Sequence, residues 1–82
     1  MNPRVASVKT LENFRLLLTF TNGEVRVFNM TPYLDIGIFK ELKDIAYFRT
    51  AKVCLGTVQW QNEQDLCPET LYLDSVPVEL GT

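Results

Sequence analysis

The chain has 82 residues, of which 46% are hydrophobic and 11% aromatic, so it can build one small core and is too apolar to be disordered. Histidine is absent, which excludes a Ser-His-Asp triad, a Cys-His pair and metal ligation by imidazole. The formal net charge is −2, whereas proteins that bind nucleic acid directly usually carry a positive excess. We therefore expect a single domain over residues 1–82 with no direct binding to nucleic acid.

The alternation of apolar and polar segments predicts three strands, a broken helical stretch, two strands and a short C-terminal helix. Thr31-Pro32 is a typical helix start, and Pro68 with Glu69 is another. Strands and helices are segregated along the chain, so the expected fold class is α+β with a small, mainly antiparallel sheet. The expected strands are 4–9, 14–20, 24–29, 51–55 and 57–60, and the expected helical pieces are 31–35, 38–43, 45–49 and 68–73.

A hairpin is the strongest local signal. Asn22-Gly23 stands between two apolar runs and predicts a two-residue type I′ turn, in which both residues have positive φ. A loop of that length would pair Phe20 with Val25 and Leu18 with Val27 on one apolar face. The opposite face would be mixed and partly apolar, so we expect another element or a second subunit to cover it in part.

The two cysteines, Cys54 and Cys67, are too few for a structural zinc site. No hydrophobic leader precedes Asn2-Pro3-Arg4, so we expect a cytoplasmic protein whose cysteines are reduced and unbridged. The longest apolar runs are too short to span a bilayer, and no spacing of residues indicates a cofactor.

Carboxylates are the only plentiful group with catalytic potential. Three of them follow the single tryptophan, but they lack the alternating ligands and the glycine of a calcium loop. A solvated acidic loop or a contact with a partner is the simpler interpretation, and we assign no catalytic and no metal-binding residue. Trp60 itself fits either a core position or an interface anchor. The candidate partner-binding residues are Trp60, Glu63, Asp65, Glu69 and Tyr72.

Charge is divided unevenly along the chain. Residues 1–52 contain all eight Lys and Arg and five acids, a net charge of +3, whereas residues 53–82 contain five acids and no base, a net charge of −5. If this division persists in the fold, an acidic side would steer a basic partner toward the protein. The alternative is an ordinary solvated surface.

A series of motifs covers nearly the whole chain. They are Pro3–Val5, Leu16–Phe20, Asn22–Arg26, Phe39–Asp44, Tyr47–Phe48, Gly56–Trp60, Asp65–Leu66 and Leu71–Tyr72. In this order they resemble the small bacterial domain-of-unknown-function family 2442, whose fold is similar to the N-terminal domain of a Nitrosomonas helix-turn-helix protein. The resemblance implies a compact α+β domain, often encoded as one half of a two-gene pair, and implies no catalytic residue.

The leading functional hypothesis is a non-enzymatic protein-binding module that acts in the cytoplasm, as one half of a toxin–antitoxin-like pair with a short basic protein. The first alternative is a regulatory or small-ligand-sensing dimerisation domain of the kind associated with helix-turn-helix regulators, working as a homodimer. A carboxylate-dependent enzyme is the third.

Overall fold

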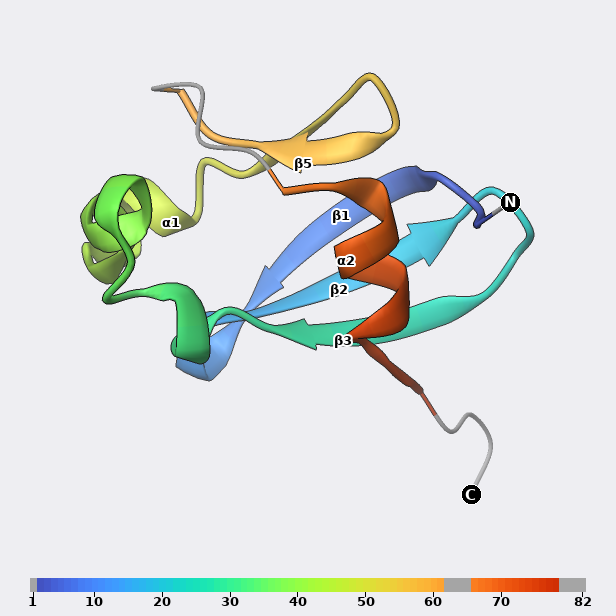
Figure 1. Ribbon diagram of the computed structural model, residues 1–82, viewed down its shortest axis with the longest axis horizontal. Coiled ribbons are helices and arrows are strands. Elements are labelled where there is room, and N and C mark those ends of the chain that lie inside the picture. The colour runs from blue at the N-terminus through green and yellow to red at the C-terminus, as the bar shows by residue number, and fades with distance from the viewer. Residues whose placement is uncertain (1, 62–65, 79–82) are drawn as a thin grey trace.

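The computed structural model describes residues 2–61 and 66–78 of the chain (Figure 1). The strands are β1 (Val5–Leu11), β2 (Arg15–Phe20), β3 (Val25–Asn29), β4 (Lys52–Cys54), β5 (Thr57–Gln59) and β6 (Val76–Pro77). The helices are the 3-10 helices η1 (Glu12–Phe14), η2 (Thr31–Tyr33) and η3 (Gly37–Lys43) and the α-helices α1 (Ile45–Phe48) and α2 (Pro68–Leu73).

Four strands form one antiparallel sheet in the order β1-β2-β3-β6, and β4 and β5 form a separate two-stranded hairpin. The backbone N–H of Val5 donates to the carbonyl of Gly56 at 2.9 Å, which joins the start of β1 to the turn of that hairpin. Helix α2 runs across β2 and β3 on one face of the sheet (Figure 1). The predicted α+β class and the predicted order of its elements are confirmed. One further strand, β6, follows α2 and pairs with β3.

The register of the β2–β3 hairpin differs by one residue from the predicted register. Leu16 pairs with Phe28, and both side chains are fully buried. Val25 and Val27 alternate with Phe28 along β3 and lie half-buried on the other face of the sheet. The predicted pairing of Phe20 with Val25 is wrong, because Val25 pairs with Thr19, which lies on the opposite face of β2 from Phe20. The predicted pairing of Leu18 with Val27 is wrong for the same reason, since Val27 pairs with Leu17.

The hairpin loop has three residues instead of two, which is the physical reason for the shifted register. The N–H of Gly23 donates to the carbonyl of Phe20 at 2.9 Å, and the N–H of Phe20 donates to the carbonyl of Glu24 at 2.8 Å. Gly23 has φ +90°, whereas Asn22 is not among the residues with positive φ. This pattern matches a type I turn followed by a left-handed glycine bulge, the usual three-residue hairpin loop.

The connection between β1 and β2 is strained. Asn13 has φ +62° and Phe14 has φ +57°, a left-handed conformation that is rare for a bulky residue. The N–H of Met30 donates to the carbonyl of Phe14 at 2.8 Å, and the Phe14 ring packs edge-on against Phe48 with centroids 5.3 Å apart. Phe14, predicted to begin the second strand, therefore belongs to the connection, and its contacts hold the left-handed backbone in place.

One hydrophobic core lies between the sheet, the β4–β5 hairpin and the helices. Strands β2 and β3 supply residues of one face only, and β1, the helical stretch, the second hairpin and the segment that includes α2 supply the rest. Among residues 2–61 and 66–78, thirteen hydrophobic residues are buried: Val5, Leu16, Leu18, Phe20, Phe28, Met30, Leu34, Leu42, Phe48, Val58, Trp60, Leu66 and Leu71.

The helical stretch between β3 and β4 is short and mostly of the 3-10 type. Asp44 caps α1, because its Oδ1 accepts a hydrogen bond from the N–H of Ala46 at 3.0 Å. Thr31 does not cap η2. The Asn29 side chain takes that role by accepting from the N–H of Thr31 at 3.0 Å, and Pro32 follows within the helix.

Candidate partner-binding surfaces

Trp60 is a core residue. Its side chain is completely buried, its ring stacks on Phe48 with centroids 6.0 Å apart, and its Nε1–H donates to the Phe48 carbonyl at 2.9 Å. No part of the indole reaches the surface, and its only polar atom already has a partner. The structure therefore corrects the prediction that Trp60 anchors a partner, and selects the core alternative.

Tyr72 belongs to a polar network that joins α2 to the β2–β3 hairpin. Its hydroxyl donates to the Glu24 carboxylate, and the Arg26 guanidinium lies over its ring at 4.6 Å from the centroid. Arg26 also donates to Glu24 at 3.1 Å and to the hydroxyl and carbonyl of Ser75 at 2.8 and 2.7 Å. Tyr72 is half-buried, so its ring and its hydroxyl act mainly within the fold.

This network shifts two pKa values. The Tyr72 hydroxyl, then the Asn22 amide and Arg26, hold the pKa of Glu24 below its ordinary value of 4.5, and they outweigh the opposing effect of burial. The same carboxylate raises the pKa of Tyr72 above its ordinary value of 10.0. The hydrogen bond between these two groups is the largest cause of both shifts, because it favours the ionised carboxylate and the neutral phenol.

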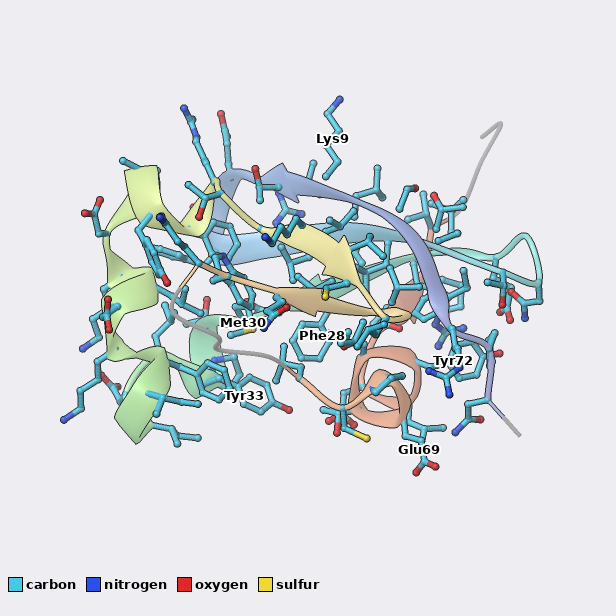
Figure 2. The ribbon with its side chains drawn as sticks, turned by 90° about the horizontal axis from the view of Figure 1, so that it is seen from above. Lys9, Phe28, Met30, Tyr33, Glu69 and Tyr72 are labelled. Atoms are coloured by element: carbon cyan, nitrogen blue, oxygen red, sulfur yellow. The ribbon has the colours of Figure 1, made fainter. Side chains whose placement is uncertain are left out.

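The remaining predicted residues do not form one described site. Glu69 is exposed in the first turn of α2 and lines a pocket of about 170 Å³ with Arg4 and Cys67. Glu63 and Asp65 lie outside the described residues. Figure 2 shows Glu69 and Tyr72 on the side of the sheet that faces α2. Of the five acids in residues 53–82, Glu69 and Asp74 are described and exposed, and Asp74 accepts a hydrogen bond from the Tyr33 hydroxyl.

The opposite side of the sheet, which we call the outer face, is a surface that the sequence analysis did not locate. Figure 2 shows Lys9 projecting from β1 away from Phe28 and α2. The outer-face positions on β2 and β3 belong neither to the core nor to the hydrophobic residues packed against it. The outer face consists of Ser7, Lys9, Leu11, Arg15, Leu17, Thr19, Val25, Val27, Asn29 and Val76.

One row of paired residues crosses all four strands of the outer face. Lys9 pairs with Leu17, Leu17 pairs with Val27, and Val27 pairs with Val76. Leu17 and Val27 are half-buried, and Val76 keeps 65% of its surface exposed. The row therefore begins with a cation on β1 and continues as three aliphatic side chains toward β6. The sequence would have indicated the Leu17–Val27 part of this row if the hairpin register had been predicted correctly, because a shift of one residue exchanges the two faces.

The charges on the outer face have one sign. The Lys9 side chain is exposed and has no hydrogen-bond or ion-pair partner among the residues that the structure describes. The Nε of Arg15 donates to the backbone carbonyl of Glu12 at 3.1 Å. Because this acceptor is uncharged, the hydrogen bond does not neutralise the guanidinium. None of the ten outer-face positions is acidic. The surface is thus aliphatic on β2, β3 and β6 and cationic on β1 and β2.

A pocket of about 270 Å³ lies beside one corner of this face, between the β1–β2 connection and α1. Its apolar lining includes Leu11, Phe14 and Phe48, and Glu12 and Arg49 contribute charged side chains of opposite sign. Among residues 2–61 and 66–78, no three His, Cys, Asp or Glu side chains are grouped so as to hold a metal ion. Within the same residues, no helix has the length and apolarity needed to cross a membrane.

The family model described as "Protein of unknown function (DUF2442)" matches residues 5–77, which include every strand of both sheets. The chain belongs to the DUF2442 family. The DUF2442 match confirms the family resemblance seen in the motifs. No curated protein and no solved structure matches the chain. The DUF2442 description names no activity, so the evidence for a function comes from the surfaces of the protein.

Proposed function

We propose that this protein is a non-enzymatic protein-binding module that docks a partner on the outer face of its sheet. The observation that carries the proposal is the row from Lys9 through Leu17 and Val27 to Val76, which presents aliphatic side chains on an open sheet face. Contiguous exposed apolar surface rimmed by charge is typical of protein interfaces. The partner would be a protein encoded as the other half of a two-gene pair, as the family resemblance implies.

The outer face supports this role better than the acidic C-terminal third does. Trp60 is in the core, and Tyr72 is engaged with Glu24 and Arg26, so neither aromatic is free to be a buried anchor for a partner. The short basic partner expected from the sequence would contact the acidic third, where Glu69 is exposed. The outer face, which carries cations, would instead attract the acidic part of a partner.

The free cysteines are consistent with action in a reducing compartment such as the cytoplasm. Cys54 is half-buried, Cys67 is exposed, and both are unbridged in the structure. An exposed free thiol persists in the cytoplasm, where glutathione and thioredoxin keep thiols reduced. The proposal is that binding takes place in the cytoplasm.

The experiment is affinity capture from the native host with matched baits. One bait is the wild-type protein, and a second carries Leu17→Thr with Val27→Thr, which removes apolar surface and keeps two residues that favour strands. We expect a protein captured by the wild type to be lost from the double variant. A third bait with Ile36→Thr and Leu73→Thr, at exposed positions away from the outer face, should retain it.

Circular dichroism and the emission of the buried Trp60 check that all three baits are folded. Trp60 is enclosed by the core, so its emission should be blue-shifted and identical in the three proteins. Equal capture by the wild-type and outer-face baits would refute the proposed docking surface. Loss of capture by the control bait alone would move the site to the helical side.

A further inference from the structure

We propose that the outer face receives a short amphipathic helix of the partner, with apolar residues one turn apart and carboxylates at the end that lies over Lys9 and Arg15. This inference rests on the proposed function and deepens it, because it specifies the chemistry of the docking segment. Three observations carry it: the spacing of the aliphatic row, the single sign of the charges, and the orientation of α2 on the other face of the same sheet.

The spacing of the row suits a helix laid across the strands. Adjacent strands are about 4.8 Å apart, and one turn of α-helix rises about 5.4 Å. Residues one turn apart on a helix therefore meet successive strands, with apolar anchors over Leu17, Val27 and Val76. The whole row from Lys9 to Val76 spans about 14 Å, which corresponds to about ten helical residues.

The fold itself contains a helix in this orientation. Helix α2 runs across β2 and β3 on the inner face (Figure 1), and its Leu71 is completely buried. Tyr72 of the same helix packs edge-on against Phe20 of β2, with ring centroids 5.1 Å apart. A short helix can thus cross these strands on the inner face. On the outer face, the row from Lys9 to Val76 runs across the same strands.

The charges select an acidic segment. Lys9 ends the row on β1, and Arg15 lies beside that end of the row, on the adjacent strand β2 two residues from Leu17. No outer-face residue supplies a carboxylate. A partner that buried the row without acids would leave both cations near a desolvated interface, which costs free energy. Carboxylates at that end would pair with them and would fix the direction in which the helix lies.

The same charges argue against a second copy of this chain as the occupant. Two outer faces brought together would gather two copies of Lys9 and Arg15, and neither face contributes an acid to neutralise them. Like charges close together in an interface oppose association. A homodimer formed through the outer face is therefore the competing occupant, and sedimentation of the protein alone tests for it.

The probe is a pair of alanine-based helical peptides of about 14 residues, with leucine at i, i+4 and i+7. One peptide carries three glutamates in the turn beyond the last leucine, and its match carries three lysines there. Binding is followed by NMR shifts of the full-length protein, with the methyl groups of Leu17, Val27 and Val76 as reporters. We expect the acidic peptide to bind at these methyls at least about tenfold more tightly than the basic peptide, with an advantage that shrinks at high salt.

Charge reversal supplies the decisive comparison. Lys9→Glu with Arg15→Glu should invert the preference between the two peptides, whereas Lys40→Glu with Lys43→Glu on η3 should leave it unchanged. Equal binding of both peptides at the outer face would overturn the charge selection. If neither peptide binds at millimolar concentration while the capture assay still depends on Leu17 and Val27, the helical occupant is wrong and the proposed function stands.

Sedimentation of the protein alone tests the remaining occupant. The inference expects a monomer at concentrations of about 100 µM, because nothing neutralises the cations of the outer face. A dimer that Leu17→Thr with Val27→Thr converts to monomer would show that a second copy occupies the face, and would overturn the inference.

Discussion

Leu16 of β2 lies directly opposite Phe28 of β3, and neither side chain has any exposed surface. This pair fixes which residues of the hairpin enter the core, since side chains alternate between the faces of a strand. It places Val27, the neighbour of Phe28, on the outer face with Leu17. The residues that make up the outer face are therefore set by this register.

Substitutions at the two neighbouring positions test the register. Phe28→Leu should destabilise the protein by about 1–2 kcal/mol, because it removes buried volume from a packed core. Val27→Thr should cost under about 0.5 kcal/mol, because threonine suits a strand and its hydroxyl can reach water on the outer face. Urea unfolding monitored by Trp60 emission measures both. A larger loss for Val27→Thr than for Phe28→Leu would favour the two-residue loop.

The glycine of the hairpin loop provides a second test. Gly23 has φ +90°, and a Cβ added there would meet no atom within 4 Å, so any cost of substitution is backbone strain. Gly23→Ala should lower the free energy of unfolding by about 1–2 kcal/mol, and Gly23→Asn should cost roughly half as much, since asparagine tolerates the left-handed region. Thermal unfolding of both variants would check the order. An alanine variant as stable as the wild type would contradict the bulge geometry.

The hairpin also shows how far the sequence determines this fold. Asn22-Gly23 correctly predicts a turn, but the same dipeptide suits a two-residue and a three-residue loop. The choice between them depends on whether Phe28 or Val27 enters the core. Phe28 fills the space next to Met30 and Tyr33, as the stacked Phe28 and Tyr33 rings show at 5.5 Å. That tertiary packing cannot be read from local spacing, so fold class and element order were predictable and the two faces were not.

Tertiary packing also separates the two aromatic residues of the candidate site. Trp60 and Tyr72 flank an acidic stretch in the sequence, but the fold directs the first into the core against Phe48 and the second toward Glu24 and Arg26. Sequence proximity indicated a cluster that the structure does not form. The outer face can be identified only from the strand pairing, which places four residues that are far apart in the sequence in one row: Lys9, Leu17, Val27 and Val76.

The two thiols should differ in reactivity. Both are free, so a thiol reagent under denaturing, non-reducing conditions should count two per chain. In the folded protein Cys67, which is exposed, should react well before Cys54, which is half-buried in β4. Cys67→Ser should remove the fast phase and leave the slow one. A count of zero would show a disulfide and would contradict the expected reducing compartment.

The network around Glu24 predicts how stability depends on pH. The pKa of Glu24 in the folded protein is below its ordinary value of 4.5, chiefly because the Tyr72 hydroxyl donates to its carboxylate. A carboxyl group whose pKa is lowered by folding contributes stability above its unfolded pKa, and that contribution is lost as pH falls through the folded pKa. The loss should therefore begin near pH 4.5 and continue below it.

Two variants separate this hydrogen bond from the packing around it. Tyr72→Phe keeps the ring against Phe20 and under Arg26 but removes the donor, so the pKa of Glu24 should rise toward 4.5 and the acid-dependent loss of stability should shrink. Glu24→Gln should remove the Glu24 component altogether. Urea unfolding between pH 3 and pH 7 measures the slopes, with Glu69→Gln as a control for the loss of an exposed carboxylate on α2. If Tyr72→Phe left the pH slope of the wild type unchanged while Glu24→Gln flattened it, the stabilisation of the carboxylate would come from Asn22 and Arg26 and not from the phenol.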